Sequence, residues 1–70
     1  MTIEELRDHL LRLIETYVTS SGAQEELVSL VNRCDVPVKA ILIGLAPFVS
    51  SERISEMDAQ TIGDIAFHFC

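Results

Sequence analysis

The segment that most limits how this chain can fold is residues 36–46, because its apolar side chains point in every direction around a helix. Lys39 is the only charged residue within it. A helix that is apolar all round has to be covered all round. A run this short also fits a strand. We predict a helix, because no other segment offers a strand with which it could pair.

The chain is short for the task of covering such a helix. It has 70 residues, of which 49% are hydrophobic, and a domain of this size buries about 60% of the surface of its unfolded chain. A single core this small supplies roughly 3–5 kcal/mol. Two neighbouring helices leave a third side of the segment free. A fourth helix, a second copy of the chain or a partner protein is expected to cover it.

The clearest helix signal lies at the start of the chain, where a capping box precedes an amphipathic stretch. Thr2 and Glu5 have the spacing at which a hydroxyl and a carboxylate each accept a hydrogen bond from a free backbone amide. Apolar residues then recur three and four positions apart. They are Ile3, Leu6, Leu10, Leu13, Ile14 and Tyr17. This spacing predicts a helix over 3–20, followed by small turn residues.

Further helix starts follow, each marked by a side chain that can accept hydrogen bonds from backbone amides. The capping residues are Ser21 with Gln24, Asp35, Ser50 with Ser51, and Asp58. Pro47 ends the third helix because it has no backbone N–H to donate. The predicted fold is a single all-α domain over 1–70, a compact bundle of four to five short helices. They span 3–20, 22–34, 36–46, 52–57 and 59–69.

The spacing of apolar residues also predicts which faces point inward. The inward residues of the second helix are Ala23, Leu27, Leu30, Val31 and Cys34, and those of the last are Ile62, Ile65, Ala66 and Phe69. Cys34 is therefore expected to be a core thiol.

Composition and charge exclude several functions. Eleven acidic residues stand against five basic ones, for a net charge of −6. Binding a nucleic-acid backbone requires clustered Lys and Arg, so no direct nucleic-acid partner is expected. The longest apolar run, 40–49, is too short to cross a membrane. The first residues lack the pattern of a secretion signal, so we expect a cytoplasmic protein with reduced thiols.

No group of residues has the spacing of a catalytic or cofactor site. The potential metal ligands are His9, Cys34, His68 and Cys70, and no two of them have the spacing of a zinc site. The serines lie in caps and turns, and the paired carboxylates lie in first helical turns. An activated nucleophile needs a positioned base in a pocket, which none of them offers. We expect neither an enzyme nor a bound metal or cofactor.

An acidic ridge on the first helix is the main candidate for a binding surface. Glu4, Asp8 and Glu15 project within a narrow arc, with Glu5 beside them. Asp8 and Arg12 are expected to pair at i,i+4, which neutralises part of the ridge. One interpretation is a solvated face opposite the core. The other is a docking site for a basic protein partner.

Two apolar features could supply further contacts. Phe67 projects away from the core face of the last helix, as an anchor for a partner protein would. Ala40 and Gly44 place two small residues on one side of the third helix, so with Ile43 they form a candidate face for self-association.

Two functions remain. The first is a small acidic, non-catalytic binding module that occupies a basic protein surface as an inhibitor, immunity or antitoxin-type factor, anti-activator or adaptor. The alternative is an obligate homodimer that serves as a structural, dimerisation or docking domain of a larger assembly.

Overall fold

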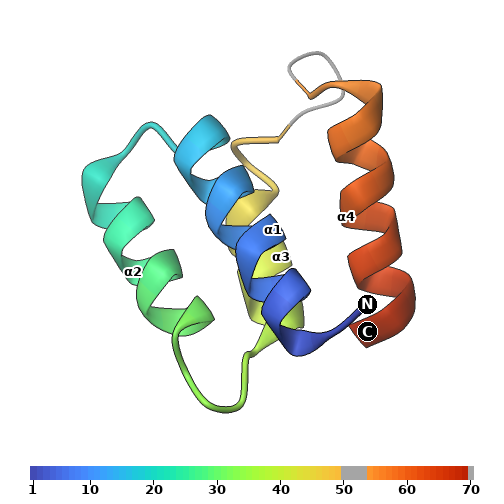
Figure 1. The fold of residues 1–70 in the computed structure, drawn as a ribbon. Helices are drawn as coiled ribbons and strands as arrows, with labels where there is room; N and C mark the ends of the chain where they lie inside the picture. Colours follow the sequence, from blue (N-terminus) through green and yellow to red (C-terminus); the bar gives the residue numbers. More distant parts are fainter. Residues whose placement is uncertain (50–53, 70) are drawn as a thin grey trace.

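The computed structural model describes residues 1–49 and 54–69. These residues form four α-helices and no strand (Figure 1). The helices are α1 (Ile3–Tyr17), α2 (Ser21–Val31), α3 (Val38–Leu45) and α4 (Glu56–Phe69). The prediction of an all-α bundle is confirmed.

The contacts between helices form a closed ring, in which each helix packs against two others. In Figure 1, α1 lies in front of α3, with α2 on one side of this pair and α4 on the other. Both α1 and α3 contact α2 and α4. The outer helices therefore depend on α1 and α3 for their tertiary contacts.

One core joins all four helices. Its buried residues are Leu6, Leu10, Leu13, Ile14, Val18, Leu27, Val31, Val38, Ile41, Leu45 and Ile65. The spacing of three and four residues on α1 correctly predicted most of the core residues that this helix contributes. Ile3 is an exception, because it lies in the first turn and remains 43% exposed.

The all-apolar segment is only partly covered. Val38, Ile41 and Leu45 are buried, whereas Ala40 is exposed and Ile43 has 65% of its surface accessible. A fourth helix was one of the three expected covers for this segment; α4 does contact α3, but part of the segment remains accessible.

The predicted capping box at the start of α1 is confirmed. The Thr2 hydroxyl accepts a hydrogen bond from the Glu5 amide, and the Glu5 carboxylate accepts one from the Thr2 amide. The helix ends at Tyr17 rather than at residue 20. The β-branched Val18 and Thr19, which lose side-chain freedom in a helix, follow it directly.

The predicted limits of the second and third helices need correction. The N-cap of α2 is Ser20 and not Ser21, and it makes no side-chain capping bond. The N-cap of α3 is Pro37 rather than Asp35. A residue before proline avoids the helical conformation, which explains why α3 cannot begin at Val36.

The predicted core thiol is wrong. Because α2 ends at Val31, Cys34 lies outside the helix and is exposed.

The last two predicted helices, 52–57 and 59–69, correspond to one helix in the described part of the chain. Helix α4 begins at Glu56, so Glu56 and Met57 belong to it and Asp58 lies in its first turn. The cap is Ser55, whose hydroxyl oxygen accepts a hydrogen bond from the Asp58 amide at 3.2 Å. The predicted caps at Ser50 and Ser51 and the start of the 52–57 helix lie outside the described residues.

Candidate functional site

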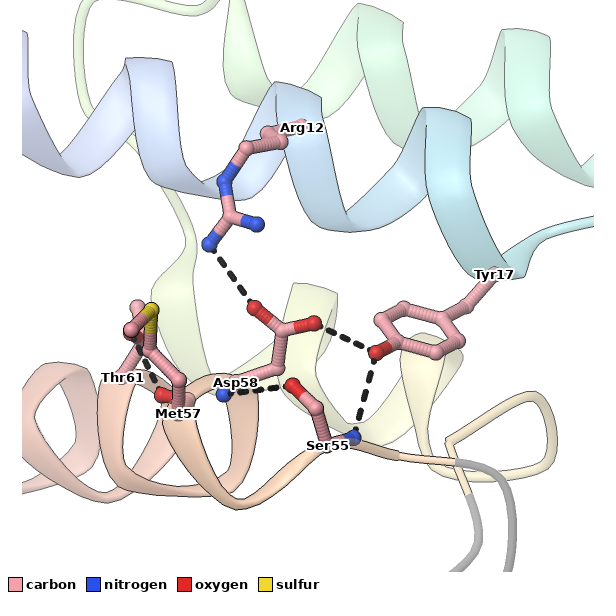
Figure 2. A network of polar contacts seen from close by, with 6 residues as sticks. All are labelled: Arg12, Tyr17, Ser55, Met57, Asp58 and Thr61. Carbon is pink, nitrogen blue, oxygen red and sulfur yellow. Dashed lines mark hydrogen bonds and ion pairs between the residues drawn. The ribbon is translucent and has the colours of Figure 1, made fainter.

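A buried carboxylate joins α4 to α1. Asp58 is 7% exposed and is the one buried charged residue in the part of the chain that is described. Figure 2 shows Arg12 and Tyr17 reaching it from α1. The Tyr17 hydroxyl donates to Oδ2 at 2.5 Å, and Arg12 Nη2 lies 2.9 Å from Oδ1. The Ser55 amide donates in turn to the Tyr17 hydroxyl oxygen at 3.5 Å.

These contacts keep the carboxylate ionised. The hydrogen bond from Tyr17 holds the pKa of Asp58 below its ordinary value, and the bond and charge of Arg12 act in the same direction. Partial burial opposes them but does not prevail. Because Tyr17 and Arg12 belong to α1 and Asp58 to α4, the network joins the two helices, and we call it the joint.

Sequence reasoning missed this joint. It assigned Asp58 to capping, Tyr17 to the core stripe and Arg12 to a pair with Asp8. In the structure Arg12 binds Asp58 instead, and a partly buried carboxylate attracts the guanidinium more strongly than an exposed one. The spacing of Ser55 and Asp58 was the available signal, since it matches a helix start.

A second arginine is also directed into the molecule. From α1, Arg7 Nη2 donates to the carbonyl oxygen of Arg33 at 2.8 Å, and its Nε donates to that of Val31 at 3.3 Å. These carbonyls lie at the end of α2, where backbone acceptors lack helical partners. Arg33 forms an exposed pair with Asp35 at 3.6 Å.

The acidic ridge is therefore left without its expected internal counterion. Glu4, Asp8 and Glu15 are all exposed on α1, and none of them forms an ion pair with another described residue. Glu5 is also exposed, but its carboxylate belongs to the capping box. Its backbone hydrogen bond with Thr2 lowers its pKa.

An open groove of about 340 Å³ lies beside one end of this ridge. It is lined by Glu15 of α1 and by Gln24, Glu25, Val28 and Ser29 of α2. Glu25 enters the candidate surface here. It was expected in the first turn of a helix as a stabilising charge, but α2 begins at Ser21 and has no acidic residue in its first turn. The short connection between the two helices was the signal, because it makes them antiparallel neighbours.

The apolar candidates lie on other helices. Phe67 is 85% exposed on α4, with its ring edge-on to that of His68 at a centroid distance of 5.4 Å. Ala40 and Ile43 are exposed on α3. Gly44 instead faces α2, because a Cβ atom added there would lie 2.8 Å from Cδ2 of Leu27.

Residues 1–49 and 54–69 contain neither a group of metal ligands nor a helix that could span a membrane. No three His, Cys, Asp or Glu side chains there are grouped so that they could hold a metal ion. No helix in those ranges is both long and apolar enough to cross a membrane.

Comparison with known proteins adds no relative. The sequence matches no family model, and no curated protein or solved structure matches the chain. In the described residues, the fold is all-helical and the exposed carboxylates make its surface acidic.

Proposed function

We propose that this chain is a non-catalytic binding module that occupies a basic surface of another protein in the cytoplasm. Its role would be that of an inhibitor, an immunity or antitoxin-type factor, an anti-activator or an adaptor. The observation that carries the proposal is that Arg7 and Arg12 bind groups outside the ridge, which leaves Glu4, Asp8 and Glu15 without ion pairs to other described residues.

Such a ridge acts mainly on how fast and how selectively a partner is found. Unpaired carboxylates on one face attract a basic surface over about one Debye length and orient it before contact. Phe67 supplies apolar area of the kind that anchors an interface once water is excluded.

The test begins with affinity capture from the source lysate at low and at high salt, followed by mass spectrometry. The proposal expects one stoichiometric basic protein that is lost at high salt. Its association rate is then measured with the Asp8→Lys, Glu15→Lys double variant. Because steering depends on local charge, association should slow by about tenfold at low salt.

The matched control carries the same change of charge on another helix. Glu56 and Asp64 are exposed on α4, so Glu56→Lys with Asp64→Lys alters the net charge equally. This control should retain most of the association rate. Equal slowing in both variants, or no slowing in either, would contradict a role for the ridge.

A homodimer remains the second candidate, favoured by the exposure of Ile43 and Ala40 on α3. It expects a dimer in sedimentation velocity that dissociates in Ile43→Glu. Met57→Glu is the control, because Met57 is 75% exposed on α4. A wild-type monomer at micromolar concentration would exclude the homodimer. Gly44→Leu is unsuitable as the test variant, because it disturbs Leu27 inside one molecule.

A further inference from the structure

The groove between α1 and α2 combines two acidic side chains with an apolar one. Glu15 comes from α1 and Glu25 from α2, while Val28 lines the same space. Two carboxylates from separate helices therefore share one concave surface of about 340 Å³. This volume is at the lower end of the range of ligand sites, so it suits one side chain better than a large ligand.

The charges in the groove have no partner among the described residues. The side chains of Glu15 and Glu25 form no hydrogen bond and no ion pair with any described residue. Arg7 and Arg12 are bound elsewhere. A metal ion does not fit, since no three acidic, histidine or cysteine side chains of the described ranges are grouped suitably.

We propose that this groove receives a single arginine side chain of the protein partner. The inference rests on the proposed function and deepens it, because it locates where a basic partner is recognised. A guanidinium presents several donors in a fixed plane, so a single one can bond two carboxylates.

The remaining lining residues fit the rest of such a side chain. The methylene groups of arginine pack well on apolar surface, which Val28 provides. Gln24 and Ser29 bring side-chain oxygens. These oxygens can accept hydrogen bonds from those guanidinium N–H groups that the two carboxylates do not bind. Arginine thus matches the groove in charge, in hydrogen-bonding capacity and in its apolar stem.

The test uses the intact chain and a defined probe. N-acetyl-arginine methylamide is titrated at constant ionic strength while backbone amide shifts are recorded by NMR. The neutral isostere N-acetyl-citrulline methylamide and N-acetyl-lysine methylamide are titrated in parallel. The expected result is a set of shifts concentrated on residues 24–29 and around Glu15, seen with the arginine probe and absent with citrulline.

A matched pair of variants separates the groove from general charge. Glu25 lines the groove, whereas Glu26 is its exposed neighbour on the same helix and does not. Glu25→Gln should weaken arginine binding by about 2- to 5-fold, the range of an exposed ion pair, and Glu26→Gln should leave it nearly unchanged. Amide spectra of both variants verify that the fold is retained.

Three results would overturn the inference. They are shifts spread over the whole acidic surface or absent, equal effects of Glu25→Gln and Glu26→Gln, and equal binding of the lysine and arginine probes.

Failure of this inference is distinct from failure of the proposed function. A basic partner whose association slows in Asp8→Lys, Glu15→Lys but not in Glu25→Gln would retain the ridge and reject the groove. Binding of the arginine probe without capture of any basic protein would retain the groove as an arginine site and reject the proposed function.

Discussion

At the scale of single residues, a few polar side chains join helices beside the apolar core. Asp58 is engaged by Tyr17 and Arg12 of α1, and Arg7 of α1 binds carbonyls at the end of α2. Partly buried polar groups are costly to leave unpaired, so each of these contacts fixes the position of one helix against α1.

Removing the Tyr17 hydroxyl tests the joint between α1 and α4. Tyr17→Phe should lower the thermal midpoint by roughly 4–8 °C, the shift expected for one lost hydrogen bond in a domain of this size. Thr61→Val is the control, because the Thr61 hydroxyl donates to the Met57 carbonyl within α4 and joins no second helix. Comparable midpoints for the two variants in thermal unfolding followed by circular dichroism would argue against the joint.

Arg7 and Arg33 offer a second comparison between an inward and an outward arginine. Arg7→Met should lower the free energy of unfolding by about 1 kcal/mol, because it leaves carbonyls at the end of α2 without a protein donor. Arg33→Met removes only an exposed ion pair and should change it by less than about 0.5 kcal/mol. Urea unfolding measures both, and a larger effect at Arg33 would reverse the assignment.

At the scale of helices, glycines mark where packing is close and where it is open. Gly44 of α3 lies against Leu27 of α2, so a side chain there displaces a core residue. Gly63 lies within α4, and a Cβ atom added there would meet nothing within 4 Å. Glycine lowers helix stability at both positions, but only at Gly44 does packing oppose its replacement.

Substitutions at the two glycines should therefore differ in sign. Gly63→Ala should raise the free energy of unfolding by roughly 0.5–1 kcal/mol, the difference in helix propensity. Gly44→Leu should lower it by about 1–3 kcal/mol through overpacking against Leu27. Urea denaturation decides the matter, and stabilisation by Gly44→Leu would mean that α2 and α3 are not packed closely.

The sequence allowed the helices to be predicted where local signals dominate. The capping box of Thr2 and Glu5 and the stripe on α1 depend only on neighbours along the chain, and both predictions are confirmed. The bonds from Arg7 to the end of α2 and from Tyr17 to Asp58 join residues more than twenty positions apart. No spacing along the chain reveals such contacts, and the same holds for the groove that joins Glu15 to Glu25.

At the scale of the whole molecule, acid should weaken the fold through two carboxylates. Hydrogen bonds lower the pKa values of Glu5 and Asp58, the first with Thr2 and the second with Tyr17. A carboxyl group whose pKa is lower in the folded than in the unfolded state stabilises the fold above its unfolded pKa. This contribution is lost as the pH falls through the folded pKa.

Thermal midpoints of wild type and Asp58→Asn should therefore converge at low pH. Wild type should be the more stable at pH 6, where Asp58 is ionised and bound to Arg12 and Tyr17. The difference should shrink below about pH 4, as the carboxyl group takes up its proton. Calorimetry from pH 2 to pH 7 checks this, and a difference independent of pH would show that ionisation of Asp58 contributes nothing.

The joint at Asp58 also gives the molecule a built-in optical reporter. The chain contains one tyrosine and no tryptophan, so near-ultraviolet emission excited at the tyrosine band arises from Tyr17 alone. The phenol is hydrogen-bonded to a carboxylate while α4 is docked, and it is solvated once α4 departs. Emission and absorbance of the unlabelled protein therefore follow the attachment of one helix, whereas circular dichroism follows the helical content of the whole chain.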